Sequence, residues 1–597
     1  MTNNSSNPRN LRVVLIGVLA LAAAAALLLL RAPDKRPQVS ELPSQADIAA
    51  ALLEATLPRN SGPKGYVTSD ACRECHAKQH DSWAHSFHSK MTQVMSTNSV
   101  VADFNRITMD HQSERFTMDH DGNQFWVEIR DATPNEPTTP SINEASQPLR
   151  IPMGLVTGSH HLQVFWLPAG YGNMQIGFPF TWLIDDARWV PREDAFIRPH
   201  DSLPQKEIWN LTCIRCHTTA SQPRPEPANN RFDTHVAELG ISCEACHGPG
   251  EQHVQHQQAR ASLPDTTEST QPDTTIVQPQ HLESVRASQV CAFCHSMKWF
   301  DDSEGWKETG FKYRPGDDLE VTTPIIRPTA IESQPWLHAV LEKHPDLLEG
   351  FFWNDGMIRV AGREYNGLVE SPCYQKGTLS CLSCHSLHYY ESNDDQLARG
   401  MNSNQACLQC HETMAKNLPA HTHHAANSAG SECYNCHMPH TAYALLKATR
   451  SHQIDSPTVT STLATGRPNA CNLCHLDQTL EWTGQQLQEW YGQEPIDLPE
   501  NERTISSQLI ALLSGDAGQR ALAAWSMGWE PAREASGSDW QPTHLARLLD
   551  DPYSAVRYIA ARSLRSFPGF GDLDYDFTAP SEERTAARHG VLEKITT

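Results

Sequence analysis

Pro372–His440 contains the segments PCYQKGTLSCLSCHSLH (372–388), ACLQCHE (406–412), HTHH (421–424) and CYNCHMPH (433–440). Within it the pattern C-x-x-C-H occurs three times, each copy beginning 26 residues after the one before. Five more copies lie elsewhere, where chance would give on the order of 0.02 in the whole chain. In chain order the copies are Cys72/Cys75/His76, Cys213/Cys216/His217, Cys243/Cys246/His247, Cys291/Cys294/His295, Cys381/Cys384/His385, Cys407/Cys410/His411, Cys433/Cys436/His437 and Cys471/Cys474/His475.

Each copy places two thiols three residues apart, with a histidine directly after the second thiol. This spacing fits the two vinyl groups of one haem, and the histidine reaches the iron as its proximal ligand. Disulfide bonds would not need a histidine after each pair, and zinc knuckles would leave the eight histidines without a role. The sequence therefore predicts eight covalently attached c-type haems, at haem sites 1 to 8 in chain order.

Composition supports a fold built partly around cofactor. The formal net charge is -23 and the mean hydropathy is -0.50. With eight haems filling much of the core, we expect a mainly α multihaem cytochrome c with sparse secondary structure. An acidic chain of this size disfavours nucleic acid and favours redox partner proteins with basic docking surfaces.

The N-terminal segment predicts a membrane attachment. An apolar run of 18 residues, Val13–Leu30, would be about 27 Å long as a helix, close to the hydrocarbon thickness of a bilayer. No small-residue cleavage site follows, so residues 1–31 are expected to form an uncleaved signal anchor, with a cleaved signal peptide as the alternative. Haem attachment to C-x-x-C-H takes place outside the bacterial cytoplasm. The expected location is the periplasm, with this transmembrane helix in the inner membrane.

Differences in composition and in the spacing of apolar residues divide the rest of the chain into regions. Residues 32–65 are rich in proline and predict a tether, and 66–480 form the octahaem cytochrome c domain. Between sites 1 and 2, RFTMDHDGNQFWVEI (115–129) alternates apolar positions about a turn, which predicts a β-rich insertion at about 104–200. LARLLDDPYSAVRYIAARSLRSFPG (545–569) resembles one HEAT-type repeat, so 481–597 are expected to be an α-helical, HEAT-like region. Because no cysteine follows Cys474, we expect the tail after about 500 to be separable from haem binding.

A second axial histidine at each iron would make the haems low-spin electron carriers. Two candidates, His388 and His440, each follow a proximal histidine by three residues, too few to reach the far face of the same haem. Each is therefore expected to ligate a neighbouring haem, while the alternative for every candidate is an ordinary surface residue or one that hydrogen-bonds a haem propionate. The candidates are His88, His253, His388, His423 or His424, His440 and His452.

The segments GSHHLQVFW, CEACHGPG, YRPGDD, GREYNG, ESPCY, LSCLSCHSLH, CHMPH and RSHQIDSP resemble a family of octahaem c-type cytochromes with helical-repeat C-termini. That family looks related to pentahaem nitrite reductases, hydroxylamine oxidoreductases and octahaem tetrathionate reductases. The resemblance implies electron transfer and, in some relatives, catalysis on small nitrogen or sulfur compounds. This chain has no C-x-x-C-K motif, and no tyrosine that cross-links to haem can be assigned.

Two functions follow from these observations. The first is a membrane-anchored periplasmic electron carrier with closely spaced, mostly bis-histidine haems. The second is a multihaem oxidoreductase acting on nitrite, hydroxylamine or tetrathionate at one open haem. Cys373, the one cysteine outside the motifs, is a candidate catalytic residue if Arg363 or Lys376 lowers the pKa of its thiol, and otherwise a small buried hydrophobe.

Overall fold

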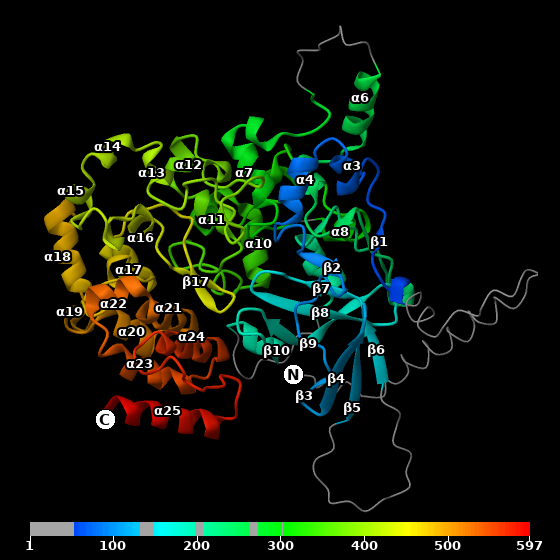
Figure 1. Ribbon diagram of the computed structural model, residues 1–597. Helices are drawn as coiled ribbons and strands as arrows, with labels where there is room; N and C mark the ends of the chain where they lie inside the picture. The colour runs from blue at the N-terminus through cyan, green and yellow to red at the C-terminus, as the bar shows by residue number, and fades with distance from the viewer. Residues whose placement is uncertain (1–52, 132–148, 198–206, 263–272, 301, 597) are drawn as a thin grey trace, which may run out of the picture.

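The computed structural model describes residues 53–131, 149–197, 207–262, 273–300 and 302–596 (Figure 1). The predicted signal anchor, 1–31, and most of the predicted tether lie outside these ranges. Among the described helices, none combines the length and the apolar composition needed to cross a bilayer.

Two antiparallel sheets lie between haem sites 1 and 2. A four-stranded sheet has the order β3-β4-β5-β6, and a five-stranded sheet has the order β10-β9-β8-β7-β2. The strands are β2 (Thr92–Val94), β3 (Ile107–His111), β4 (Glu114–Asp121), β5 (Gln124–Asp131), β6 (Leu149–Met153), β7 (Leu155–Thr157), β8 (Leu162–Pro168), β9 (Gln175–Leu183) and β10 (Arg188–Pro191). These strands overlap the range predicted to be β-rich, and their classification as an insertion stays a prediction.

Alternation along the strands builds the core between the sheets. Phe116 and Met118 of β4 are buried, and Met118 is paired with the buried Val127 across the β4–β5 hairpin. The hairpin turns at Gly122, whose φ of 55° lies in the left-handed region that favours glycine. Inward-facing aromatic rings, among them Phe104, pack edge to face and close this core.

The haem-bearing part consists of short helices joined by loops. Its helices are α3 (Ser69–Arg73), α4 (Ala77–Ala84), α5 (Cys243–His247), α6 (Glu251–Ala261), α7 (Ser284–Ala292), α8 (Ser303–Thr309), α9 (Leu319–Thr322), α10 (Pro335–Lys343), α11 (Glu364–Leu368), α12 (Pro372–Lys376), α13 (Gln405–Leu408), α14 (Glu412–Ala415), α15 (Leu418–Thr422), α16 (Cys433–His437) and α17 (Val459–Thr465). Its paired short strands are β1 (Arg59–Asn60) with β14 (His235–Val236), β11 (Thr218–Thr219) with β15 (Glu238–Leu239), β12 (Pro225–Glu226) with β13 (Arg231–Phe232), and β16 (Ala442–Ala444) with β17 (Lys447–Thr449).

The C-terminal region is helical and occupies the lower left of Figure 1. Its helices are α18 (Leu480–Tyr491), α19 (Glu500–Thr504), α20 (Ser507–Ser514), α21 (Ala517–Gly528), α22 (Glu530–Ser536), α23 (Gln541–Arg547), α24 (Ser554–Arg565) and α25 (Ser581–Thr596). α24 buries Val556, Ile559 and Leu564 against α21 and α23, as the helical spacing predicted. The HEAT-like classification of these helices stays a prediction.

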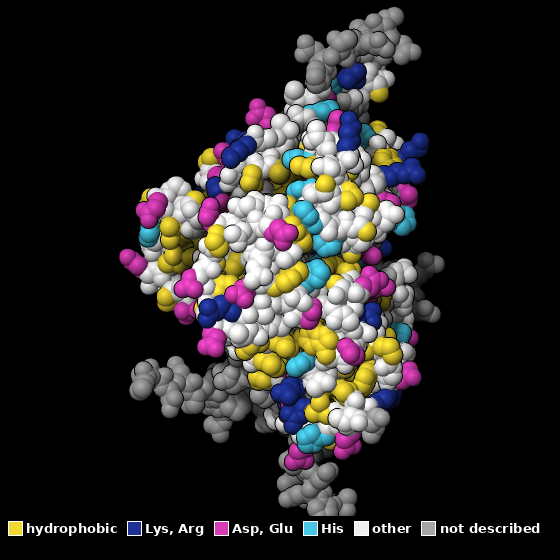
Figure 2. All heavy atoms as spheres, turned by 90° about the vertical axis from the view of Figure 1, so that its left-hand side faces the viewer, with side chains coloured by type: hydrophobic (Ala, Val, Ile, Leu, Met, Phe, Trp, Pro, Cys, Tyr) yellow, Lys and Arg dark blue, Asp and Glu magenta, His cyan; other side chains and the backbone are white. Residues whose placement is uncertain are grey.

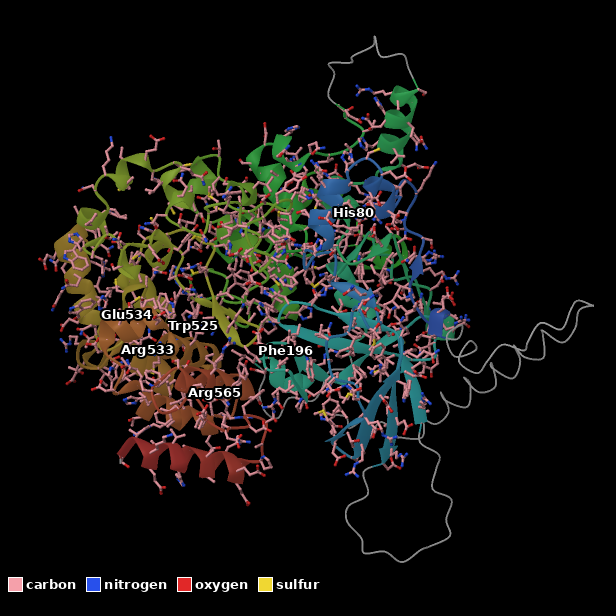
Figure 3. All side chains as sticks on the ribbon, in the orientation of Figure 1. His80, Phe196, Trp525, Arg533, Glu534 and Arg565 are labelled. Carbon is pink, nitrogen blue, oxygen red and sulfur yellow. The ribbon has the colours of Figure 1, made fainter. Side chains whose placement is uncertain are left out.

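Contacts join the C-terminal region to the rest of the molecule. Leu183 and Val190 of the five-stranded sheet belong to its hydrophobic core. The Ser536 hydroxyl donates to the carbonyl oxygen of Cys474 at 2.7 Å, inside haem site 8. Trp525 of α21, labelled in Figure 3, packs on His440 in the loop after site 7. The expectation that the tail is separable from haem binding stays a prediction.

Candidate haem sites

Each C-x-x-C-H motif forms a single helical turn. In most of them a backbone hydrogen bond runs from the histidine N–H to the carbonyl oxygen of the first cysteine, as from His295 to Cys291 at 2.9 Å. Residues i, i+3 and i+4 of such a turn lie on one face. Both sulfurs and the imidazole therefore face the same side, which is the arrangement needed to hold one haem.

The second cysteine of site 1, Cys75, is open to solvent. Cys75 and Cys410 are exposed, whereas the other cysteines of the motifs are partly buried. The backbone turn is nevertheless intact, since the N–H groups of Cys75 and His76 both donate to the carbonyl oxygen of Cys72, at 3.3 and 2.9 Å. α4, which follows site 1 directly, has no buried residue either. Haem attachment at Cys75 stays a prediction, which the turn supports.

Six proximal histidines face a second histidine ring from elsewhere in the chain. A histidine nitrogen lies about 2 Å from a bound metal, so two imidazoles on opposite sides of one metal have ring centres about 6 Å apart. The observed ring-centre separations, 6.0–6.3 Å, fit this value. The pairs are His76 with His253, His247 with His388, His295 with His88, His385 with His452, His437 with His421, and His475 with His424.

Hydrogen bonds orient several of these rings. The Nδ1–H group of His247 donates to the carbonyl oxygen of Val277 at 2.7 Å, and that of His385 donates to the carbonyl oxygen of Asp395 at 2.9 Å. His253 donates from Nδ1 to the Asp273 carboxylate at 2.8 Å. Metal-bound histidines usually donate their second ring N–H in this way, which leaves Nε2 for the metal.

The histidines of the HTHH segment (421–424) that face a proximal histidine are only partly the ones that the sequence predicted. His421 and His424 each face a proximal histidine, whereas His423 stacks on Trp490 with ring centres 4.4 Å apart. The backbone reverses at His423, whose φ is 57°. Sequence reasoning named His423 and His424 and missed His421, although the spacing of three residues between His421 and His424 was visible.

His440 lies away from the proximal histidines. Its ring packs against Trp525 and Trp529 of the C-terminal region, with ring centres 4.5 and 5.2 Å away. Burial, and secondarily the charge of Arg450, lowers the pKa of His440 to about 3, so the imidazole is neutral. In the described part of the chain no histidine ring faces it at the separation of the six pairs, and its expected role as a ligand of a neighbouring haem stays a prediction.

Two proximal histidines, His217 of site 2 and His411 of site 6, have no facing histidine ring among the described residues. Site 2 has cations nearby. The pKa of the Cys216 thiol is lowered chiefly by the Cys294 side chain, and the charges of Lys298 and Arg363 lower it further. The Lys298 ammonium is buried over the Phe293 ring at 4.0 Å and has no hydrogen-bond partner in the described structure. A buried ammonium without an acceptor favours an anion close by.

Thiol contacts show which haem sites are neighbours. Cysteines of different motifs lie close enough together to shift one another's pKa, which brings the attachment points of two haems together. The contacts join Cys72 to Cys243 (sites 1 and 3), Cys216 to Cys294 (sites 2 and 4), Cys291 to Cys381 (sites 4 and 5), and Cys407 to Cys433 (sites 6 and 7).

Longer-range electrostatic contacts connect these groups. They join Cys246 to Cys291 (sites 3 and 4), Cys384 to Cys410 (sites 5 and 6), and Cys436 to Cys471 (sites 7 and 8). The sites therefore follow the order 1-3-4-5-6-7-8, with site 2 beside site 4. Figure 2 shows histidine side chains reaching the surface from one end of the viewed face to the other.

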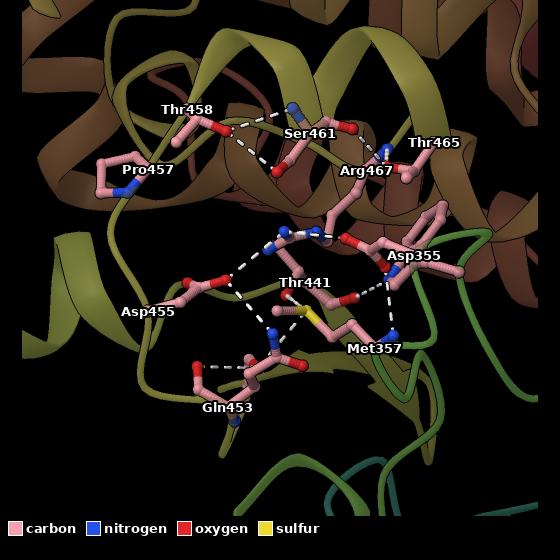
Figure 4. A network of polar contacts seen from close by, with 12 residues as sticks. Asp355, Met357, Thr441, Gln453, Asp455, Pro457, Thr458, Ser461, Thr465 and Arg467 are labelled. Carbon is pink, nitrogen blue, oxygen red and sulfur yellow. Dashed lines mark hydrogen bonds and ion pairs between the residues drawn. The ribbon is translucent and has the colours of Figure 1, made fainter. Parts of the chain in front are cut away.

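A buried ionic network supports site 7 (Figure 4). The Arg467 guanidinium contacts the carboxylates of Asp355 at 3.0 Å and Asp455 at 3.5 Å. The backbone carbonyl of Asp455 accepts the Nδ1–H of His437 at 2.8 Å. Arg467 thus fixes the loop that orients the proximal histidine of site 7.

Cys373 lies at the start of α12 and is partly buried. Its thiol is an electrostatic neighbour of Cys407, the first cysteine of site 6. The structure places it beside a haem attachment point, and its catalytic role stays a prediction.

Comparisons with known proteins agree with these sites. The family described as "Cytochrome c554 and c-prime" matches residues 71–120 and 189–248, and the doubled CXXCH motif family matches residues 374–416. No curated protein matches the chain. Similar solved structures include the outer cell wall cytochrome OcwA (15% identity, TM-score 0.45, covering 84% of this chain and 100% of that chain) and the octahaem sulfite reductase MccA of Wolinella succinogenes (13%, 0.29, 90% and 85%). The motifs, the facing histidines and the two family matches identify the chain as a multihaem c-type cytochrome, an electron-transfer protein that binds haem covalently.

Proposed function

We propose that the chain binds eight haems and transfers electrons along the run of sites 1-3-4-5-6-7-8. The observation that carries this proposal is the set of six facing histidine pairs at 6.0–6.3 Å. Each pair would hold one iron from both sides, and c-type haem supplies one-electron chemistry there. The chain's own residues place the cysteines of successive sites close to one another.

The same proposal extends to location and partners. C-x-x-C-H haem attachment supports a site of action outside the cytoplasm, in the periplasm. The formal net charge of -23 supports redox partners with basic docking surfaces. Sites 1 and 8, at the two ends of the run, are where such partners would exchange electrons.

Haem content and spin state test this function. The purified protein should contain eight haems per chain in a pyridine haemochrome assay, because all eight motifs are intact. Electron paramagnetic resonance of the oxidised protein should show low-spin signals for at least six of them, since six histidine pairs are present. Fewer than seven haems, or fewer than six low-spin centres in a sample with eight, would refute the proposal.

One observation favours a second function, that of an oxidoreductase with an open haem at site 2. His217 has no facing histidine among the described residues, and Lys298 has a buried ammonium without an acceptor. Because Lys298 and Arg363 both lie near this site, a small anion such as nitrite would find a positive environment there.

Nitrite binding tests the second function. Addition of nitrite to the oxidised protein should convert a high-spin signal into a low-spin one. Lys298→Ala should weaken the apparent affinity for nitrite about tenfold, as expected for the loss of one charge-assisted hydrogen bond. Lys307→Ala is a matched control, because Lys307 pairs with Glu304 on α8 instead. A spectrum without a high-spin component, or equal affinities in both variants, would rule out this site.

A further inference from the structure

The GREYNG segment, Gly362–Gly367, surrounds the proximal histidine of site 4. The Tyr365 N–H donates to the carbonyl oxygen of His295 at 3.0 Å, and the Asn366 side-chain oxygen accepts the N–H of Met297 at 2.6 Å. Glu364 accepts the Nδ1–H of His295 at 2.8 Å through one carboxylate oxygen and the Gly362 N–H at 2.6 Å through the other. The segment therefore fixes both the backbone and the ring of His295.

The other end of the segment reaches the neighbouring haem site. A Cβ atom on Gly367 would lie 2.6 Å from the backbone nitrogen of Gln453 and 2.9 Å from the carbonyl carbon of His452. His452 faces the proximal histidine of site 5. Only glycine permits this close approach, so the segment packs tightly between sites 4 and 5.

Glu364 gives the proximal histidine of site 4 a hydrogen-bond acceptor that differs from those at the other sites. His247, His385 and His437 donate Nδ1–H to neutral backbone carbonyls. Among the proximal histidines, all of which are described, His295 alone donates to a carboxylate. A carboxylate acceptor is negatively charged and draws the Nδ1 proton more strongly than an amide carbonyl does.

Site 4 is also the junction of the run. Its cysteines contact Cys216 of site 2 and Cys381 of site 5, and they are electrostatic neighbours of Cys246 of site 3. Every connection between site 2 and the rest of the run, as defined by these contacts, passes through site 4.

We propose that Glu364 lowers the reduction potential of the haem held at site 4. A carboxylate on Nδ1–H raises the electron donation of the imidazole to iron, and this stabilises the oxidised, more positive iron relative to the reduced one. Hydrogen bonding to an axial ligand is one of the established means of setting haem potentials. The inference rests on the proposed electron-transfer function and assigns a regulatory residue within it.

A low potential at the junction would separate the run into two parts. Electrons would reside on sites 1 and 3 on one side and on sites 5 to 8 on the other, and their passage through site 4 would be energetically uphill. Glu364 would thereby govern exchange between the two ends and between the main run and site 2.

Glu364→Gln tests this role in the haem-loaded protein. A glutamine keeps an oxygen acceptor for Nδ1–H and removes the charge. A redox titration followed by electron paramagnetic resonance should show one low-spin haem with a midpoint potential shifted upward, while the haem content stays at eight. Glu364→Asp, which retains the carboxylate, should shift the midpoint of that haem less than Glu364→Gln does.

Glu370→Gln is the matched control. Glu370 lies just after α11, is largely buried and pairs with Arg327 at 2.8 Å, so the variant removes a nearby charge without touching a ligand. Unchanged midpoints in Glu364→Gln at full haem content, or equal shifts in Glu364→Gln and Glu370→Gln, would overturn the inference. Equal midpoints in the Gln and Asp variants would also overturn it. A haem content below seven in the unmodified protein would instead refute the proposed function.

Discussion

Replacement of His388 by alanine should leave one haem without its second axial ligand, and that haem should be at site 3, although His388 follows the proximal histidine of site 5. The His388 ring lies 6.3 Å from that of His247, nearly parallel to it, whereas the ring facing His385 belongs to His452. The electron paramagnetic resonance spectrum should lose one low-spin signal and gain a high-spin one.

A double replacement shows which haem is affected. If His388 and His452 serve different irons, then His388→Ala/His452→Ala should produce two high-spin haems more than the unmodified protein has, the sum of the single variants. If both histidines served site 5, the double variant would produce only one, and the assignment would be wrong. His120→Ala is the control, because His120 stacks on Phe125 in the four-stranded sheet.

Replacement of Arg467 by methionine should lower the free energy of unfolding by about 3 kcal/mol or more, since removing one member of a buried charge cluster leaves the others uncompensated. The Arg467 side chain is 9% exposed, and its partners Asp355 and Asp455 are each 25% exposed. The Asp455 loop also orients His437, so the haem at site 7 should lose its ligand geometry at lower urea concentration than in the unmodified protein.

Urea unfolding followed by Soret absorbance and tryptophan fluorescence measures this effect. Arg115→Met is the matched control, because Arg115 forms an ion pair with Asp110 in which both side chains are more than half exposed. Exposed pairs contribute roughly 0.2–1 kcal/mol. If Arg467→Met lowered the free energy of unfolding by less than about 1 kcal/mol, the network would not hold the site 7 loop in place.

The chemistry of attachment could be predicted from the sequence because it is local. Two cysteines and a histidine at i, i+3 and i+4 meet on one helical turn wherever that turn lies in the fold. The β4–β5 hairpin about Gly122 and the buried face of α24 are local in the same sense, since side-chain periodicity and one turn residue determine them.

The second ligands depend on contacts between distant segments. His88 faces His295 across 207 positions of sequence, and no local rule connects them. In HTHH the choice among three neighbouring histidines depends on the left-handed backbone at His423 and on Trp490 and Tyr491 of α18, which contact that loop.

The sequence alone determined the covalent haem chemistry and predicted the attachment points and the proximal ligands, because these depend on residues within one turn of helix. Tertiary structure decided which histidine faces which site, the order 1-3-4-5-6-7-8, the exposure of Cys75 and the placement of Glu364 on His295. Those features depend on segments that are far apart in the chain, and long-range packing brings such segments together in ways that the spacing of residues does not specify.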